Sequence, residues 1–79
     1  MYYLYFLLCD DNSIYTGVTN DIERRFLEHK NKKGGHYTSS HNAVKIIYKE
    51  SYSTQKKALR RERQIKGWRR KKKLALINK

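Results

Sequence analysis

Residues 2–9 of this sequence are aromatic, aliphatic or cysteine at every position, and they read Tyr-Tyr-Leu-Tyr-Phe-Leu-Leu-Cys. A continuous run of this kind, rather than an alternating one, is typical of a central strand that is covered on both faces. The run is too short to cross a bilayer, and it lacks the basic residues that open a secretion signal. We therefore expect a buried strand here, and neither a leader nor a membrane anchor.

Two further strands are predicted downstream of this run. Turn-forming residues at 10–13 (Asp-Asp-Asn-Ser) separate it from a second extended segment at 14–18, which predicts a hairpin. The segment Val-Lys-Ile-Ile-Tyr-Lys at 44–49 predicts the third strand. A polar stretch that precedes it, residues 34–42, is expected to be a loop.

A first helix is predicted after the hairpin. Asn20 can cap it, with Glu23 three residues later in a capping box. Ile22, Phe26 and His29 recur with helical period, and Gly34-Gly35 is expected to end the helix.

Two more helices are expected after the third strand. Ser53 can cap the second, which ends near Lys66, and a short, very basic third helix covers 68–77. The order is then β-β-α-β-α-α. We expect one domain, 1–79, of the α/β (α+β) class, with a three-stranded, mostly antiparallel sheet flanked by three helices.

The charge of the chain predicts a polyanionic partner. Nineteen Lys and Arg against seven Asp and Glu give a net charge of +12 and a pI near 10.0. Nucleic acid is the simplest partner, although a ribosome-associated protein or a membrane-surface binder would have a similar charge. Cys9 is the only cysteine, which fits a reducing compartment, so we expect a cytoplasmic protein that is compatible with nucleoid association.

Glu62 is the only acidic residue in the last 29 positions, which also contain 12 lysines and arginines. Ala58, Glu62 and Ile65 are spaced i, i+4, i+7, so a helix here would place Glu62 on the stripe that faces the core. A surface carboxylate paired with Lys66 is the alternative. The position favours a functional carboxylate.

Two tyrosine tripeptides and one helix face carry the other candidate residues. Tyr3-Leu4-Tyr5 lies in the first strand, and Tyr15-Thr16-Gly17 lies in the second. Arg25 and His29 are one helical turn apart, on a face that also carries apolar anchors. Arg24 is expected to point elsewhere, into solvent.

In the order and spacing of these residues the chain resembles the GIY-YIG endonuclease superfamily. The resemblance is to small single-domain bacterial members and, more distantly, to the amino-terminal nuclease domain of the nucleotide-excision-repair incision subunit. The two tripeptides stand where the family has Gly-Ile-Tyr and Tyr-Ile-Gly. Arg25, His29 and Glu62 match the family's arginine, histidine and metal-binding glutamate. An asparagine that some members carry after the glutamate has no clear match.

The resemblance implies a metal-dependent endonuclease, linked to DNA repair, that hydrolyses DNA phosphodiester bonds. Its catalytic residues would be Tyr5, Tyr15, Arg25, His29 and Glu62. Glu62 would bind a single Mg²⁺ or Mn²⁺, and Arg25 would contact the scissile phosphate. Tyr5 would activate water and Tyr15 would orient it, or the reverse, and His29 would relay a proton or bind phosphate. A phenol is a poor base unless cations such as Arg25 or the metal lower its pKa.

A basic run follows Trp68 and is predicted to hold the nucleic-acid backbone. It consists of Arg69, Arg70, Lys71, Lys72 and Lys73. A solvated charge run is the alternative. We expect no second domain that reads sequence, and therefore low specificity or a protein partner that supplies specificity. A non-catalytic module that binds DNA or RNA is the alternative function.

Overall fold

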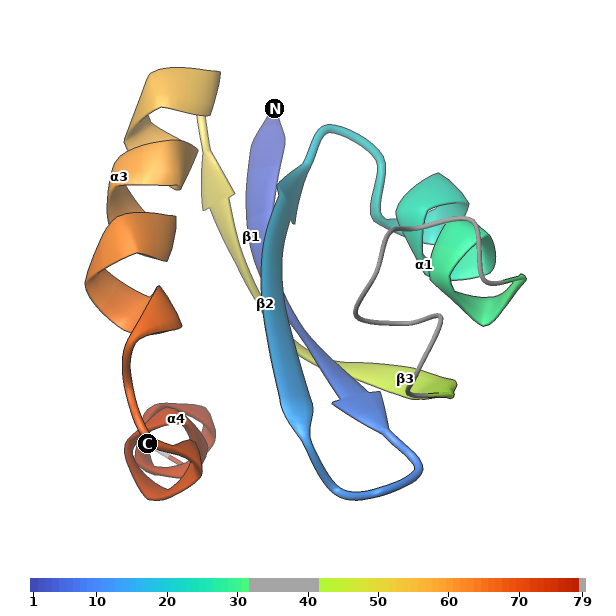
Figure 1. Cartoon of the computed structure of the whole chain (residues 1–79). Helices are drawn as coiled ribbons and strands as arrows, with labels where there is room; N and C mark the ends of the chain where they lie inside the picture. The colour runs from blue at the N-terminus through green and yellow to red at the C-terminus, as the bar shows by residue number, and fades with distance from the viewer. Residues whose placement is uncertain (32–41, 79) are drawn as a thin grey trace.

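The apolar run at the amino terminus forms the middle strand of a three-stranded sheet (Figure 1). The structure is a computed structural model that describes residues 1–31 and 42–78. Strand β1 (Tyr2–Cys9) pairs antiparallel with β2 (Ile14–Thr19) on one side and with β3 (Ala43–Tyr52) on the other. The predicted hairpin and the predicted central position of the first strand are confirmed.

Helices cover both faces of this sheet. Helix α1 (Ile22–Lys30) lies on one side of it, and α3 (Gln55–Lys66) and α4 (Arg70–Ile77) lie on the other (Figure 1). The order β-β-α-β-α-α and the α+β class are those predicted. Among the described residues, no helix combines the length and apolar character that a membrane span requires.

Alternate residues of β1 supply the two halves of the core. Leu4 and Phe6 are fully buried with Ile65 of α3. Tyr5 and Leu7 point to the other face, where side chains of α1 pack against them. Because a strand alternates its side chains between faces, a strand covered on both sides must be apolar throughout. This explains why residues 2–9 show no alternation of polar and apolar positions.

The helix caps differ from the prediction by one residue at each site. Strand β2 continues to Thr19, whose Oγ1 accepts a hydrogen bond from the N–H of Asp21. Asp21, and not Asn20, therefore caps α1, and its carboxylate accepts from the N–H of Arg24 at 3.1 Å. Similarly β3 continues to Tyr52, and Thr54 rather than Ser53 caps α3.

Other boundaries moved by a few residues. Helix α1 ends at Lys30. Helix α4 begins at Arg70, which is two residues later than the predicted start at residue 68. Strand β3 covers Ala43–Tyr52 rather than 44–49, because its pairing with β1 runs to the end of that strand. The predicted stop at Gly34-Gly35 and most of the predicted loop at 34–42 lie outside the described residues.

Candidate active site

The strand register brings Tyr5 of β1 directly opposite Gly17 of β2. A Cβ atom at Gly17 would lie 2.5 Å from the hydroxyl oxygen of Tyr5 and 3.0 Å from the ring of Tyr15. The phenol of Tyr5 thus crosses its partner strand at the one place where that strand has no side chain. Glycine is required at this position for close approach, not for backbone conformation.

Three rings meet over this crossing. The hydroxyl of Tyr5 lies 2.9 Å from Nε2 of His29 on α1. The ring centroids of Tyr15 and His29 are 5.0 Å apart in an edge-to-face arrangement, and those of Tyr5 and Tyr15 are 6.2 Å apart. Tyr5 and His29 are each 1% exposed. Two residues on a strand pair and one on α1 therefore form a single cluster at the sheet surface.

Burial shifts the pKa values of Tyr5 and His29 in the directions that keep both groups neutral. Desolvation raises the pKa of Tyr5 to about 12, although a hydrogen bond from Arg25 acts in the opposite direction. Desolvation also lowers the pKa of His29 below 6.5, and the charge of Arg25 lowers it further. Arg25 thus acts on the phenol as predicted, but the cost of burying a phenolate outweighs it.

Arg25 lies one turn before His29 on α1 and reaches both tyrosines. Burial lowers the pKa of Arg25, but hydrogen bonds with the phenols of Tyr5 and Tyr15 more than offset this and raise it. The guanidinium is also paired with Glu28 at 3.6 Å. Its side chain remains 29% exposed. Arg25 therefore connects the buried ring cluster to the solvent.

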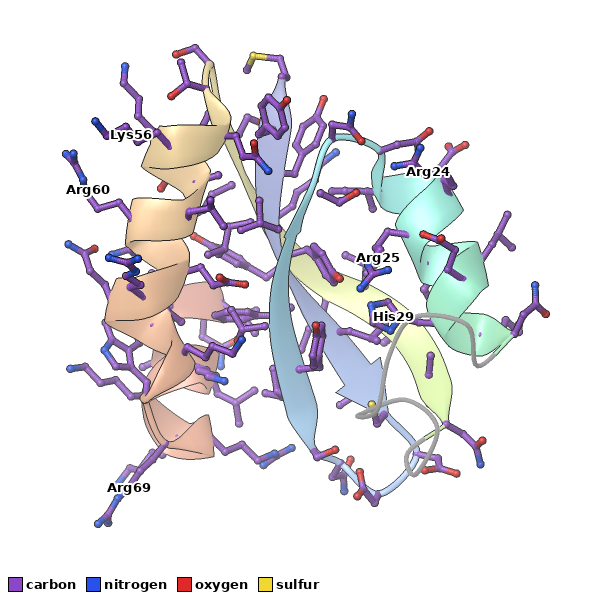
Figure 2. All side chains as sticks on the ribbon, turned by 45° about the horizontal axis from the view of Figure 1, so that its top comes forward. Arg24, Arg25, His29, Lys56, Arg60 and Arg69 are labelled. Atoms are coloured by element: carbon purple, nitrogen blue, oxygen red, sulfur yellow. The ribbon has the colours of Figure 1, made fainter. Side chains whose placement is uncertain are left out.

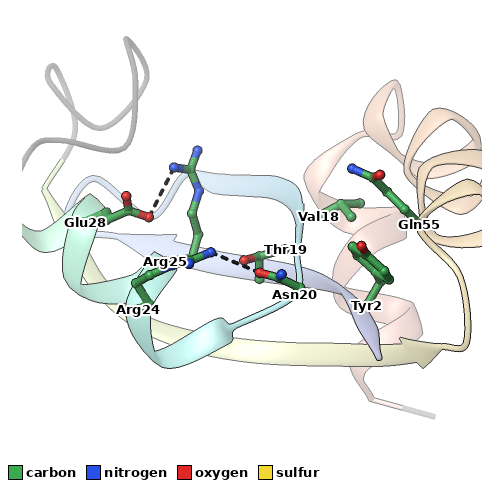
Figure 3. Close-up of a pocket in the computed structure, with 8 residues that line it drawn as sticks. All are labelled: Tyr2, Val18, Thr19, Asn20, Arg24, Arg25, Glu28 and Gln55. Carbon is green, nitrogen blue, oxygen red and sulfur yellow. Dashed lines mark hydrogen bonds and ion pairs between the residues drawn. The ribbon is translucent and has the colours of Figure 1, made fainter.

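A cationic surface hollow of about 410 Å³ adjoins this group (Figure 3). It is lined by Arg24, Arg25 and Glu28 of α1, by Val18, Thr19 and Asn20 at the end of β2, and by Tyr2 and Gln55. Arg24, predicted to point elsewhere, lines the same hollow as Arg25 and bonds to the side chain of Asn20 at 3.0 Å. The hollow offers two guanidinium groups to an anionic ligand.

Glu62 approaches from the opposite side of the sheet. On α3, Ala58 and Ile65 are fully buried and Glu62 is half-buried, which agrees with the predicted stripe. Helix α3 packs on β2 and β1. The main cause of the raised pKa of Tyr5 is burial, and the negative charge of Glu62 is the smallest of the contributions. Glu62 thus faces the sheet from the side opposite to α1, and its charge reaches Tyr5 only weakly.

The described residues contain no group of three or more His, Cys, Asp and Glu that could hold a metal ion. A protein-enclosed zinc or calcium site does not fit this arrangement. A single carboxylate does fit Mg²⁺ or Mn²⁺, since Mg²⁺ usually keeps several waters and takes further oxygens from substrate phosphate. Glu62 is the carboxylate that the helix geometry directs toward the sheet.

The basic run at 69–73 is not brought to the ring cluster. It begins α4, and Figure 2 shows Arg69 far from Arg24, Arg25 and His29. The Nε of Arg70 donates to the carbonyl of Asn12 at 2.7 Å. These positions separate the run from the residues that gather at α1.

Two members of the run also have contacts inside the protein. Nζ of Lys72 lies 4.3 Å from the ring centroid of Trp68. Lys73 is only 7% exposed, and its Nζ lies over the ring of Phe6 at 5.8 Å. Lys73 therefore differs from its exposed neighbours Arg69 and Lys71, and its buried side chain does not suit contact with a backbone phosphate.

The sequence interpretation missed a polar cluster on the α3 side of the sheet. Glu50 accepts hydrogen bonds from the hydroxyls of Tyr48 and Tyr52 at 2.5 and 2.6 Å, and it pairs with Arg61 of α3 at 3.0 Å. The alternation Tyr48, Glu50, Tyr52 was a signal that these side chains share one face. The partner helix could not be identified from that spacing.

A tyrosine pair on a β-hairpin that faces an arginine and a histidine of the next helix is the arrangement expected for a GIY-YIG domain. A sequence model of the GIY-YIG catalytic domain matches residues 1–75. The chain therefore belongs to the GIY-YIG family.

Its relatives are small proteins as well. The chain is 43% identical over 77 residues to UPF0213 protein SSP2268 of Staphylococcus saprophyticus, covering 98% of this chain and 94% of that protein. It is 40% identical over 72 residues to a UPF0213 protein of Bacillus pumilus, covering 91% and 74%. The solution NMR structure of UPF0213 protein BH0048 from Bacillus halodurans is similar, with a TM-score of 0.61, 34% identity, and coverage of 99% and 84%.

Proposed function

We propose that this chain is a metal-dependent endonuclease that hydrolyses DNA phosphodiester bonds with low sequence specificity. The observation that carries the proposal is the hydrogen bond between Tyr5 and His29, beside a guanidinium that lines a cationic hollow. Family membership supports a nuclease-like activity and a nucleic-acid substrate.

The neutral pair of Tyr5 and His29 can take a proton from water. A neutral imidazole that carries its proton on Nδ1 accepts a hydrogen bond from Tyr5 at Nε2. As the Tyr5 oxygen takes a proton from the attacking water, its own proton passes to His29. The hydroxide formed then attacks phosphorus, the bond to the leaving oxygen breaks, and that oxygen takes up a proton from water. His29, now an imidazolium, gives up the proton that it received, which restores the neutral pair. In this scheme Tyr5 never carries a full negative charge, which agrees with its pKa of about 12.

Arg25 and Glu62 supply the charges that the substrate needs. The guanidinium of Arg25 can donate to two oxygens of the scissile phosphate and cannot lose its proton. Glu62 would hold Mg²⁺ or Mn²⁺ together with water and phosphate oxygens. A bound ion would stabilise the negative charge that develops on the phosphate in the transition state. Tyr15 would orient the attacking water or the phosphate.

The direct test is a cleavage assay with the purified protein. Single-stranded, duplex and branched DNA are incubated with Mg²⁺, with Mn²⁺ or with EDTA, beside Glu62→Ala and the control Glu23→Ala. Glu23 is an exposed acid in the first turn of α1. We expect cutting that needs metal, is lost in Glu62→Ala and is retained in Glu23→Ala. Salt-sensitive binding without cutting by any of these proteins would instead identify a non-catalytic binding module, and a preference for RNA would identify an RNA-binding one.

A further inference from the structure

A second surface hollow continues from the first one. It has a volume of about 400 Å³ and lies on the outer face of α3, lined by Gln55, Lys56, Leu59, Arg60 and Arg63. Gln55 lines both hollows. Figure 3 shows Gln55 at the α3 side of the first hollow. The surface around Arg25 is therefore connected to the outer face of α3 through one residue.

The cations of this second hollow are available to a ligand. In the part of the chain that the structure describes, the ion pairs are Arg25–Glu28 and Arg61–Glu50. Lys56, Arg60 and Arg63 belong to neither pair, and all three side chains are exposed. Figure 2 shows Lys56 and Arg60 extending outward from α3. Their neighbour Arg61, in contrast, is neutralised by Glu50. The helix thus turns one arginine inward and leaves a row of unneutralised charges outside.

The spacing of this row suits a nucleic-acid backbone. Lys56, Arg60 and Arg63 follow one another at i, i+4 and i+7, so they lie on one face of the helix. They span about 10 Å along the axis at about 1.5 Å per residue. A stacked strand advances about 3.4 Å per phosphate, so this length corresponds to about three phosphates.

The apolar surface of the two hollows favours a single strand. Leu59 is 41% exposed between the cations of the second hollow, and the ring of Tyr2 lines the first. Single-strand sites combine a cationic groove with aromatic or apolar side chains that contact base faces. The base faces of a duplex are hidden in its stack, so a duplex cannot use Leu59 in this way.

We propose that a single-stranded arm of the substrate leaves the cleft at Arg25, crosses Gln55 and lies along the outer face of α3. Its phosphates contact Lys56, Arg60 and Arg63, and a base rests against Leu59. This path rests on the proposed function, because it is the route of that function's substrate. The proposal places the single-stranded nucleic acid on α3 and not on the basic run at the start of α4.

Salt-dependent binding tests this path against the α4 run. Fluorescence anisotropy with a single-stranded oligonucleotide in EDTA compares two triple variants that each remove three positive charges: Lys56→Ala/Arg60→Ala/Arg63→Ala on α3, and Arg69→Ala/Lys71→Ala/Lys72→Ala on α4. We expect the α3 variant to bind at least tenfold more weakly than wild type. The steepness of log K against log salt should decrease by about 2, because each of three lost phosphate contacts accounts for about 0.7. The α4 variant should stay within about threefold of wild type. Equal losses in both variants, or wild-type binding by the α3 variant, would overturn the proposal.

Leu59→Ala tests the strandedness of the arm. We expect it to weaken single-strand binding about fivefold and to leave duplex binding unchanged, whereas equal effects on both would exclude a base contact. Cleavage of the same oligonucleotides with Mg²⁺ separates this inference from the nuclease proposal. Binding with the expected pattern but without cutting would contradict the nuclease proposal and leave the α3 path standing. Wild-type cutting and binding by the α3 triple variant would contradict the α3 path and leave the nuclease proposal standing.

Discussion

The hydroxyl oxygen of Tyr5 lies 2.9 Å from Nε2 of His29, and the two residues come from elements 24 positions apart in the chain. Both side chains are buried, and burial moves their pKa values apart: that of Tyr5 rises and that of His29 falls. The pair therefore holds one proton between two neutral groups at pH 7. When Tyr5 takes a proton from water and passes its own to Nε2 of His29, the phenol stays neutral and the buried imidazole becomes a transient imidazolium.

Removing the Tyr5 hydroxyl tests whether the pair acts in the reaction. Tyr5→Phe keeps the ring, so we expect cleavage to fall by at least about 100-fold, with a loss of about 1 kcal/mol in the free energy of unfolding for the lost hydrogen bond to His29. Tyr15→Phe should have the smaller effect on rate. Tyr3→Phe, on the same strand and face, is the control and should cut like wild type. A larger loss in Tyr15→Phe than in Tyr5→Phe would reverse the assignment of the two tyrosines.

The pKa of His29 also predicts how stability depends on pH. Its folded value lies below 6.5, because burial and the charge of Arg25 oppose protonation. As the pH falls through about 6.5, the His29 imidazole therefore binds a proton in the unfolded chain but not yet in the folded chain. The free energy of unfolding should be highest above pH 6.5 and should fall as the pH drops from there through the folded pKa.

Denaturant unfolding at pH 7.5 and 5.5 measures this effect. His29→Gln should remove most of the difference between the two pH values, because no imidazole remains to titrate. The cleavage rate of the wild type should fall over the same range, since a protonated His29 cannot accept the Tyr5 proton. An unchanged pH difference in His29→Gln would show that other groups cause it.

The middle strand and the hairpin could be predicted because few alternatives fit residues 2–9. Their uninterrupted apolar character requires cover on both faces, and the turn-forming residues at 10–13 return the chain into a second strand. The register that places Tyr5 opposite Gly17 was not predicted and is seen only in the structure. The neighbouring positions of Arg25 and His29 follow from helical period alone. These features depend on spacing within one or two elements.

Other features depend on contacts between distant elements and could not be predicted from spacing. Asp21 caps α1 instead of Asn20 because β2 extends to Thr19, which bonds to the backbone of Asp21. The direction of the pKa shift of Tyr5 depends on how deeply α1 buries it. Lys73 is buried although it stands in a run of cations. Charge patterns identify a basic segment, but only packing decides which of its members reach solvent.

Gly17→Ala should disable the site by displacing Tyr5. The added Cβ would lie 2.5 Å from the Tyr5 hydroxyl and 2.7 Å from the ring carbon that bears it, so the Tyr5 ring or strand β2 must shift, and we expect the hydrogen bond to His29 to be disturbed. We expect a loss of about 1–3 kcal/mol in stability and at least a tenfold loss of cleavage.

Gly67→Ala is the matched control, because a Cβ at Gly67 meets no atom within 4 Å and its φ is −85°. It should cut like wild type and be as stable or slightly more stable. A fully active Gly17→Ala would mean that the Tyr5 position observed over Gly17 is not needed for the reaction.

The pair of Glu50 and Arg61 should hold α3 against β3. Burial raises the pKa of Glu50, but hydrogen bonds from Arg61, Tyr48 and Tyr52 lower it more, to below 4.5. We expect Glu50→Ala to cost about 2–4 kcal/mol, because it leaves three donors without their acceptor. The contribution of this carboxylate should be present above pH 4.5 and be lost as the pH falls through its folded pKa.

A double-mutant cycle with Glu50→Ala and Arg61→Ala measures this pair by denaturant unfolding. We expect a coupling energy of about 1–3 kcal/mol. The control is Arg60→Ala, one position earlier on the exposed face of α3, which should change stability by less than about 0.5 kcal/mol. A coupling near zero would show that Arg61 is held by its contacts with Trp68 and Gln64 and not by Glu50.

Lys73 gives the sharpest contrast between a charge that binds phosphate and one that only packs. Desolvation lowers its pKa, and the charge of Lys66 lowers it further, so the folded state disfavours the charged form of this side chain. Lys73→Met keeps the length of the side chain over Phe6 and removes the charge. We expect it to raise the free energy of unfolding by about 1 kcal/mol and to leave the salt dependence of oligonucleotide binding unchanged. Lys71→Met, at an exposed position of the same helix, is the control and should not change stability. A drop of about 0.7 in the salt slope of Lys73→Met would instead show that this lysine contacts a phosphate.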